Sequence, residues 1–233
     1  MAGGELASVN GTVVWDGVGT LRIRYDGTQP GLDPLTAQLR TRLGERILPV
    51  EALQSVETYG TGLRLVLRDG ADPLLAVTGV DVLGDLYDFP GVDQGLAEQV
   101  ALEIRRTLSR RDVPAAAARW LLAPPPAPDR IAGRDASLSV ANGQLTFTYE
   151  LRAGRRKKAY GNPWSVPLGT ILDVEWRPDQ GGLGGHGYLR IVTDRTPLDR
   201  PKPRHDPAAM VSARDTDVDV LFFAARLLTR IRP

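Results

Sequence analysis

The chain has 233 residues, of which 42% are hydrophobic, 24% are charged and none is cysteine. This length permits one large core or two small ones, and the lack of cysteine excludes a disulfide scaffold and a thiol enzyme. The net charge is only +1, which argues against a surface coated for nucleic acid. It is unevenly divided, because residues 1–123 carry 12 Arg against 16 acidic residues and residues 124–233 carry 17 Lys and Arg against 12 acidic residues.

The first half reads as short strands followed by one helix. Alternating apolar and polar residues, bounded by Gly, Pro, Asn and Asp, predict strands at 11–15, 20–26, 46–49, 55–59, 63–67, 74–77 and 86–89. An amphipathic helix is then expected from apolar residues that recur every fourth position. These are Val92, Leu96, Val100, Ile104 and Leu108.

A proline run breaks the sequence near its middle. Four of the five residues from Pro124 to Pro128 are proline, which favours a stiff extended segment and excludes a helix or a central strand. We therefore expect a first domain at 8–111, a proline-rich linker at 112–132 and a second domain at 133–233.

The second half repeats the pattern of the first. Gly19–Tyr25 corresponds to Gly143–Tyr149, Leu48-Pro49-Val50 to Val166-Pro167-Leu168, and the strand after Gly62 to the strand at 188–192. A second amphipathic helix closes the repeat. Its apolar stripe consists of Val220, Phe223, Ala224, Leu227, Leu228 and Ile231.

Strands with one apolar face need a closed or stacked sheet to bury it, and a terminal helix with an apolar stripe can plug the open end. We therefore expect a mainly β protein with some α structure (α+β). The predicted architecture is two tandem pleckstrin-homology-like, seven-stranded antiparallel barrels, each capped by a C-terminal helix. The comparison with the pleckstrin-homology plan rests on the order of strands and helix alone, so it implies no particular activity.

The residues also resemble an uncharacterised, actinobacterial domain-of-unknown-function family with tandem pleckstrin-homology-like units. In the first half the similarity lies in Trp15-Asp16-Gly17, the strand at 63–68, Gly70-Ala71-Asp72-Pro73-Leu74, Tyr87 and Ile104-Arg105. In the second half it lies in Val174-Glu175-Trp176, Gly187-Tyr188-Leu189-Arg190 and Pro203-Arg204-His205-Asp206-Pro207. The second half has Ala141-Asn142-Gly143 where the first has Trp15-Asp16-Gly17, so we expect a rebuilt first hairpin there. The resemblance implies an architecture and no assigned activity.

One segment concentrates positive charge. Two of the three lysines fall within four consecutive cations that follow the predicted strand at 145–151. Three interpretations remain open: a solvated loop, a site for an anionic ligand, or a contact with the acidic first half. The candidate anionic-ligand or partner-binding residues are Arg152, Arg155, Arg156, Lys157, Lys158 and, as support, Arg190.

Two further motifs favour structural roles. Gly182–Gly187 fits the G-x-G-x-x-G spacing of dinucleotide folds, but a strand follows it where a helix is required, so a flexible hairpin loop is expected. Asp215, Asp217 and Asp219 lack the glycine and the glutamate of a calcium loop. We expect Thr216 or Asp217 to cap the terminal helix instead.

No G-x-S-x-G elbow is present, and any serine triad would have to recruit His186 or His205 from a loop. The sequence therefore predicts a non-enzymatic adaptor or scaffold that binds protein partners or forms homo-oligomers, without cofactor, metal or nucleic acid. The alternative is a peripheral membrane or phosphate-ligand sensor that uses the basic loop. No apolar run suits a membrane span or a signal peptide, so we expect a cytoplasmic protein, with the inner face of the membrane as the site of the alternative role.

Overall fold

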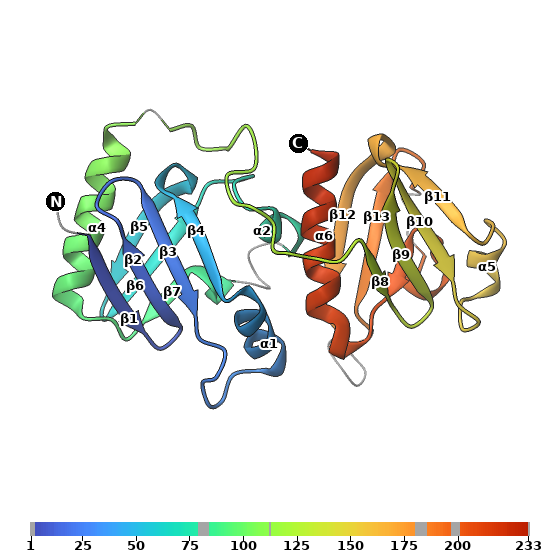
Figure 1. The fold of residues 1–233 in the computed structure, drawn as a ribbon, viewed down its shortest axis with the longest axis horizontal. Helices are drawn as coiled ribbons and strands as arrows, with labels where there is room; N and C mark the ends of the chain where they lie inside the picture. Colours follow the sequence, from blue (N-terminus) through green and yellow to red (C-terminus); the bar gives the residue numbers. More distant parts are fainter. Residues whose placement is uncertain (1–2, 79–83, 112, 180–185, 197–200, 233) are drawn as a thin grey trace. The chain divides into compact units, whose positions relative to one another are not determined.

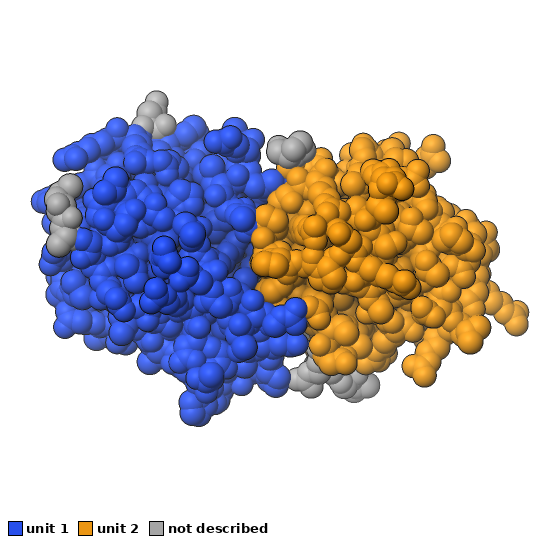
Figure 2. Space-filling model, in the orientation of Figure 1, with its two compact units in different colours: residues 1–123 blue, residues 124–233 orange. Residues whose placement is uncertain are grey.

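A computed structural model describes residues 3–78, 84–111, 113–179, 186–196 and 201–232. The chain divides into two compact units, residues 1–123 and 124–233 (Figure 2). Both units are mainly β with some helices, and they are similar in construction (Figure 1). No helix in the described part of the chain is long and apolar enough to cross a membrane.

Unit 1 contains two antiparallel sheets. The four-stranded sheet has the order β1 (Gly4–Ser8), β2 (Gly11–Trp15), β3 (Thr20–Tyr25) and β4 (Glu45–Pro49). The three-stranded sheet has the order β5 (Leu53–Tyr59), β6 (Gly62–Leu67) and β7 (Asp88–Pro90). Alternate residues of these strands are buried, as period-two patterning requires.

The helices of unit 1 lie between strands or after the last one. They are α1 (Pro34–Leu43), the 3₁₀ turn η1 (Val50–Ala52), α2 (Pro73–Thr78), η2 (Gly84–Tyr87) and α4 (Gln94–Ser109). The long helix α4 packs on β5, β6 and β1 and buries its apolar stripe against them. The helix follows the last strand of unit 1, as the sequence predicts, but it packs on two separate sheets and not on a closed barrel.

Unit 2 repeats this arrangement. Its four-stranded sheet contains β8 (Arg130–Ala132), β9 (Ala136–Ala141), β10 (Gln144–Tyr149) and β11 (Trp164–Pro167). Its three-stranded sheet contains β12 (Ile171–Arg177), β13 (Tyr188–Thr193) and β14 (Ala209–Val211). The helical segments are α5 (Arg155–Lys158), η3 (Leu168–Thr170), η5 (Pro203–His205), η6 (Arg214–Thr216) and α6 (Asp217–Ile231).

The repeat extends to irregularities of the backbone. In both units a proline ends the fourth strand, a 3₁₀ turn follows, and the next strand starts with a bulge, between Leu53 and Ser55 or between Ile171 and Asp173. The first residue of each 3₁₀ turn donates its N–H to the carbonyl of the glycine just before the third strand. Val50 donates to Gly19 at 2.8 Å, and Leu168 donates to Gly143 at 2.9 Å. Because a bulge is a specific local feature, its presence at the same place in both units supports a true structural repeat.

The hairpin between the second and third strands, which is the first hairpin expected from the sequence, differs between the units as predicted. In unit 1 the Asp16 carboxylate accepts hydrogen bonds from the N–H groups of Val18, Gly19 and Thr20. In unit 2 the hairpin turns through Asn142 and Gly143, both at positive φ. Two such residues form the tight turn that suits the right-handed twist of a β-ribbon.

The expectation of closed barrels is wrong. In each unit the strands form separate sheets of four and three strands. The strand-to-strand hydrogen bonding of the first sheet stops where Pro49 or Pro167 ends the fourth strand. The 3₁₀ turn that follows then carries the chain into the second sheet. At the opposite corner of unit 1 the sheets approach at one backbone hydrogen bond among the described residues, from Val9 N–H to the Pro90 carbonyl.

Two further expectations for unit 1 need correction. Residues 74–77 lie in α2 and not in a strand, because Asp72 accepts the Leu74 N–H at 3.0 Å and the helix buries Leu74 and Val77 on one face. The strand β1 and the helix α1 were not expected. The number of strands therefore agrees with the expectation only because the false strand at 74–77 and the missed strand β1 offset each other.

The segment 112–132, which was expected to form a linker, makes hydrogen bonds with unit 1 in its first part and with unit 2 in its last part. Its first part hydrogen-bonds within unit 1, where the N–H of Ala117 donates to Asp69 and the N–H groups of Leu121 and Leu122 donate to Ala71. Its last part belongs to unit 2, where Arg226 of α6 donates to the Ala127 carbonyl and Arg230 pairs with Asp129.

A buried ion pair holds the end of unit 1. Arg46 of β4 donates to both carboxylate oxygens of Asp72, at 2.7 and 2.9 Å, and to the Ala123 carbonyl at 3.1 Å. The Tyr87 hydroxyl accepts a hydrogen bond from the same guanidinium at 2.6 Å and donates to Asp72 at 2.6 Å. Two residues from the motifs of unit 1, Asp72 and Tyr87, thus satisfy one buried guanidinium.

Candidate functional site

The candidate basic residues lie in the connection between β10 and β11. Its base is closed by Asn162, whose side chain accepts the Tyr149 N–H at 2.8 Å and donates to the Tyr149 carbonyl at 3.0 Å. These two bonds imitate a strand pair. The intervening residues 150–161 therefore form a defined loop and not a slack connection.

Within this loop the cations fold into one helical turn, α5. The Gly154 carbonyl accepts the N–H groups of Lys157 and Lys158, and the Arg155 carbonyl accepts that of Ala159. Successive side chains of a helix point about 100° apart, so adjacent cations cannot all face the same way. Lys157 points inward, whereas Arg155, Arg156 and Lys158 are exposed.

Lys157 is completely buried. Its ammonium donates to Asp135 at 2.5 Å and to the Ala209 carbonyl at 2.7 Å. The second oxygen of Asp135 accepts the Val211 N–H at 2.9 Å. Burial lowers the pKa of Lys157, and the negative charge of Asp135 opposes that shift. This lysine fastens α5 to β14 and to the β8–β9 turn.

Arg190 is also buried. Its Nε donates to Asp206 at 2.7 Å, and its terminal nitrogen donates to the Pro201 carbonyl at 2.8 Å. Asp206 in turn accepts the Ala208 N–H at 2.9 Å. Arg190 thus holds the segment that carries η5, and like Lys157 it is not presented to a ligand.

Two exposed cations join the loop from a distant part of the sequence. The turn η5 packs against α5, and a Cβ built on Gly154 would lie 3.0 Å from the Arg204 carbonyl oxygen. Lys202 and Arg204 are therefore close to the β10–β11 loop and are both exposed. We call the following six exposed cations the basic surface. They are Arg152, Arg155, Arg156, Lys158, Lys202 and Arg204.

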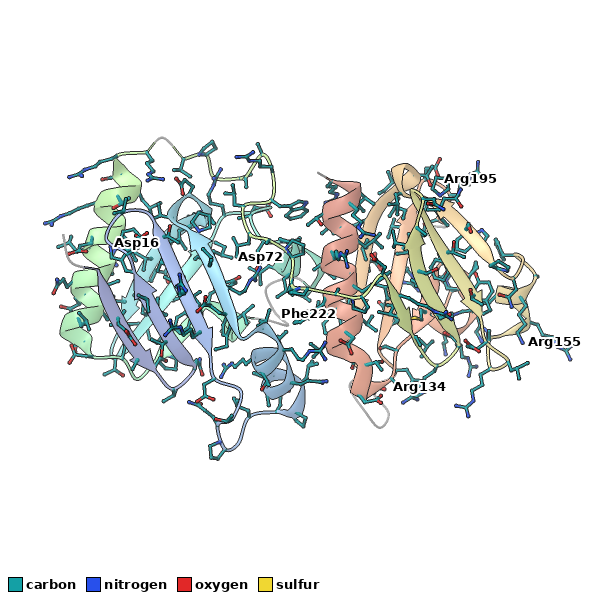
Figure 3. All side chains as sticks on the ribbon, viewed as in Figure 1. Asp16, Asp72, Arg134, Arg155, Arg195 and Phe222 are labelled. Atoms are coloured by element: carbon teal, nitrogen blue, oxygen red, sulfur yellow. The ribbon has the colours of Figure 1, made fainter. Side chains whose placement is uncertain are left out.

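The six predicted cations fall into an exposed group and a buried group. Arg152, Arg155, Arg156 and Lys158 face solvent, and Figure 3 shows Arg155 projecting away from the sheets of unit 2. Lys157 and Arg190 form the support beneath them. Sequence reasoning missed Lys202 and Arg204 because about 45 residues separate them from the loop, although the Pro203–Pro207 motif contains Arg204.

The equivalent connection of unit 1 carries no such surface. The insertion between β3 and β4 contains α1, and its Asp33 side chain accepts the N–H groups of Leu35 and Thr36 at the start of that helix. Arg40 on α1 is buried. The two units therefore use the same position in the fold for different insertions.

The remaining motifs are structural where they are described. Residues 180–185 of the glycine-rich stretch lie outside the described residues, and His186 is exposed with its Nδ1 3.0 Å from Arg134. Asp217 does not cap α6, and the Thr216 side chain makes no cap hydrogen bond either. Asp217 instead accepts hydrogen bonds from the Asp179 N–H and the Ser212 hydroxyl. Burial raises the pKa of Asp217, and the charge of Asp179 adds to that effect.

Within the described ranges, no group of three or more His, Asp or Glu side chains is placed to hold a metal ion. No curated protein and no solved structure matches the chain. The family described as a domain of unknown function, DUF4429, matches it twice, at residues 19–105 and 140–228. Each match falls within one structural unit, so the chain is a tandem member of the DUF4429 family.

Proposed function

We propose that this chain is a non-catalytic binding protein with two pleckstrin-homology-like units, and that the basic surface of unit 2 docks on the anionic surface of a membrane. The observation that carries the proposal is the convergence of six exposed cations from two separate segments on one supported surface. The strand order and the terminal helix of each unit support the comparison with the pleckstrin-homology plan.

The number of cations decides whether such docking is strong enough. A basic residue near an anionic leaflet contributes about 1 kcal/mol. The four exposed cations of the loop alone would supply roughly 4 kcal/mol, which corresponds to millimolar binding. Adding Lys202 and Arg204 raises the sum to roughly 6 kcal/mol and the affinity to tens of micromolar. The contribution of η5 therefore brings the affinity into the range of peripheral membrane binding.

The supporting ion pairs favour a binding role over simple solubility. A solvated loop needs no fixed shape, whereas this loop is closed by Asn162 and fastened by the buried Lys157. Fixing a loop before binding reduces the entropy lost when it meets its partner. The same fastening keeps Lys158 and the arginines of α5 exposed.

Co-sedimentation with vesicles tests the proposal. The full chain should bind phosphatidylcholine vesicles that contain phosphatidylglycerol more strongly than vesicles of phosphatidylcholine alone. A Lys202→Ala/Arg204→Ala variant should bind roughly 30-fold more weakly, since two cations are removed. The matched control is Arg177→Ala/Arg195→Ala, which removes two exposed arginines of unit 2 that do not belong to the basic surface and should change binding less than about threefold.

Two outcomes would overturn the proposal. One is equal binding to the two kinds of vesicle. The other is an equal loss in the two double variants, which would indicate attraction by net charge alone. Inorganic phosphate at millimolar concentration should not displace the protein, because the proposed partner is an extended surface and not a single phosphate.

A second candidate function is recognition of a protein or of a second copy of the chain. Strand β4 lies at the edge of its sheet and pairs only with β3 among the described strands, and its Ile47 side chain is 58% exposed. Such an edge can accept an added strand. Sedimentation velocity tests recognition of a second copy: a concentration-dependent dimer that Ile47→Lys abolishes would favour self-association through β4, and a monomer throughout would reject self-association.

A further inference from the structure

The large apolar side chain with the highest exposed fraction among the described residues lies inside the basic surface. Leu151 is 95% exposed and directly precedes Arg152. Isolated exposed leucines are common, so exposure alone carries no conclusion. The surroundings of this leucine are what distinguish it.

The backbone at Leu151 is held in place. The Lys158 ammonium donates to the Leu151 carbonyl at 3.0 Å, and the Ala153 N–H donates to the Glu150 carbonyl at 3.0 Å. The Glu150 N–H donates to the Asp135 carbonyl at 2.9 Å. The side chain is therefore held out from the protein by a formed turn, and it does not need to rearrange in order to reach a partner.

An aromatic residue stands at the other end of the same loop. Tyr160 is 61% exposed, and its ring contacts Trp164 edge-on with the ring centroids 6.2 Å apart. Tyrosine has an apolar ring and a polar hydroxyl, which suits the headgroup region of a bilayer. The loop thus combines an apolar side chain, an amphipathic one and a set of cations.

We propose that Leu151 inserts into the acyl boundary of an anionic bilayer while Tyr160 and the cations of the basic surface remain among the headgroups. This inference rests on the proposed membrane function and deepens it, because it assigns the depth and the orientation of docking. Charge complementarity selects the bilayer as the partner, since Arg152 and Lys158 next to Leu151 would meet lipid phosphates as the leucine enters.

A single-cysteine probe tests insertion directly. The chain contains no cysteine, so Leu151→Cys provides one labelling site for an environment-sensitive fluorophore. Leu172→Cys is the matched control, because Leu172 is also an exposed leucine of unit 2 but lies on β12. With phosphatidylglycerol vesicles we expect a blue shift and quenching by acyl-chain quenchers at position 151, and an unchanged signal at position 172.

Binding by the unlabelled protein supplies the second measurement. Leu151→Ala should weaken vesicle binding about tenfold without changing its dependence on salt, since apolar burial is not screened by ions. Leu172→Ala should bind as the unmodified chain does. A probe at 151 that stays in water while the protein sediments with vesicles would reject insertion and leave the proposed function intact. Failure of the unmodified chain to sediment with anionic vesicles would reject both.

Discussion

The ammonium of Lys157 lies 2.5 Å from the Oδ2 atom of Asp135, and both side chains are buried. Lys157 belongs to the run of cations that the sequence marks as a candidate site for an anionic ligand or a partner, yet it faces the interior of unit 2. Its partners are a carboxylate and the Ala209 carbonyl. The pair links the exposed loop to the sheets that carry it.

Removing the charge of Lys157 should destabilise unit 2. Lys157→Met leaves the Asp135 carboxylate buried without its cation, although the Val211 N–H still donates to it, and breaking one side of a buried ion pair costs about 3–5 kcal/mol. Denaturant unfolding followed by circular dichroism measures the loss. The control is Arg156→Met at an exposed position of the same helical turn, where a change within about 0.5 kcal/mol is expected. Equal effects at the two positions would show that the buried pair has no special role.

The Arg46–Asp72 pair makes a corresponding prediction for unit 1. Arg46→Lys keeps the positive charge but cannot reproduce the two parallel contacts with Asp72, so we expect a loss of about 2 kcal/mol in unfolding free energy. Arg22→Lys, at an exposed pair with Glu45, should cost less than about 1 kcal/mol. The prediction fails if Arg46→Lys is as stable as the unmodified chain in urea unfolding.

Binding to anionic vesicles should weaken steeply with salt. Raising the ionic strength from about 0.1 M to about 1 M shortens the Debye length from about 10 Å to about 3 Å, which screens exposed charges. The Lys202→Ala/Arg204→Ala variant should show a shallower dependence than the unmodified chain, because fewer cations contribute. The Arg177→Ala/Arg195→Ala variant should keep the original slope, and a shallower slope there would argue against a localised surface.

Three tyrosines predict how the protein responds to alkali: Tyr87 and Tyr149 are buried, and Tyr25 is half-buried with its hydroxyl enclosed. Burial raises the pKa of Tyr25, Tyr87 and Tyr149 above the usual value of 10.0, and nearby carboxylates such as Asp72 and Asp206 add to the shift. A raised pKa in the folded state means that the folded protein holds protons which the unfolded chain has lost. Stability is therefore fully present below pH 10 and declines as the pH rises further.

Absorbance of the phenolate group measures this titration. We expect these three tyrosines to ionise only as the chain unfolds, so that the late part of the absorbance curve coincides with loss of the circular dichroism signal. Ionisation of all six tyrosines of the chain before any loss of structure would contradict the burial of these hydroxyls.

The hairpin between β9 and β10 depends on backbone conformation. Gly143 has a φ of 72° and no atom within 4 Å of the place that a Cβ would occupy, so Gly143→Ala meets no steric obstacle beyond its own backbone. That conformation costs a residue with a side chain about 1 kcal/mol. Gly169→Ala is the control, because Gly169 is equally open and its φ is not in the positive range. Thermal unfolding should separate the two variants, and equal melting temperatures would contradict the turn geometry.

Local periodicity determined much of the fold. Strand alternation marked β2 to β6, and the apolar stripes marked α4 and α6, because one face of each element must be buried. The repeated Leu-Pro-Val and Val-Pro-Leu segments were recognised as equivalent, and in both units the proline ends the fourth strand just before a 3₁₀ turn, because proline has no N–H to donate to a strand ladder. The proline run lies at the boundary between the units.

Where periodicity was ambiguous or weak, the sequence misled. Four apolar residues at 74–77 suit a buried strand as well as a short helix, and only the Asp72 contact to the Leu74 N–H and the packing of that face decide for α2. A sheet closes into a barrel only if its edge strands pair with each other. No local sequence pattern encodes that pairing, and in both units the two sheets remain separate.

The basic surface shows the same division between what the sequence and the tertiary structure determine. The sequence by itself located a concentration of charge in the β10–β11 loop, because composition is visible without coordinates. Only the tertiary structure decided that Lys157 and Arg190 are buried beside Asp135 and Asp206, and that η5 brings further cations beside α5. The physical reason is that the direction of a side chain, and the neighbours it meets, follow from packing between segments distant in the chain.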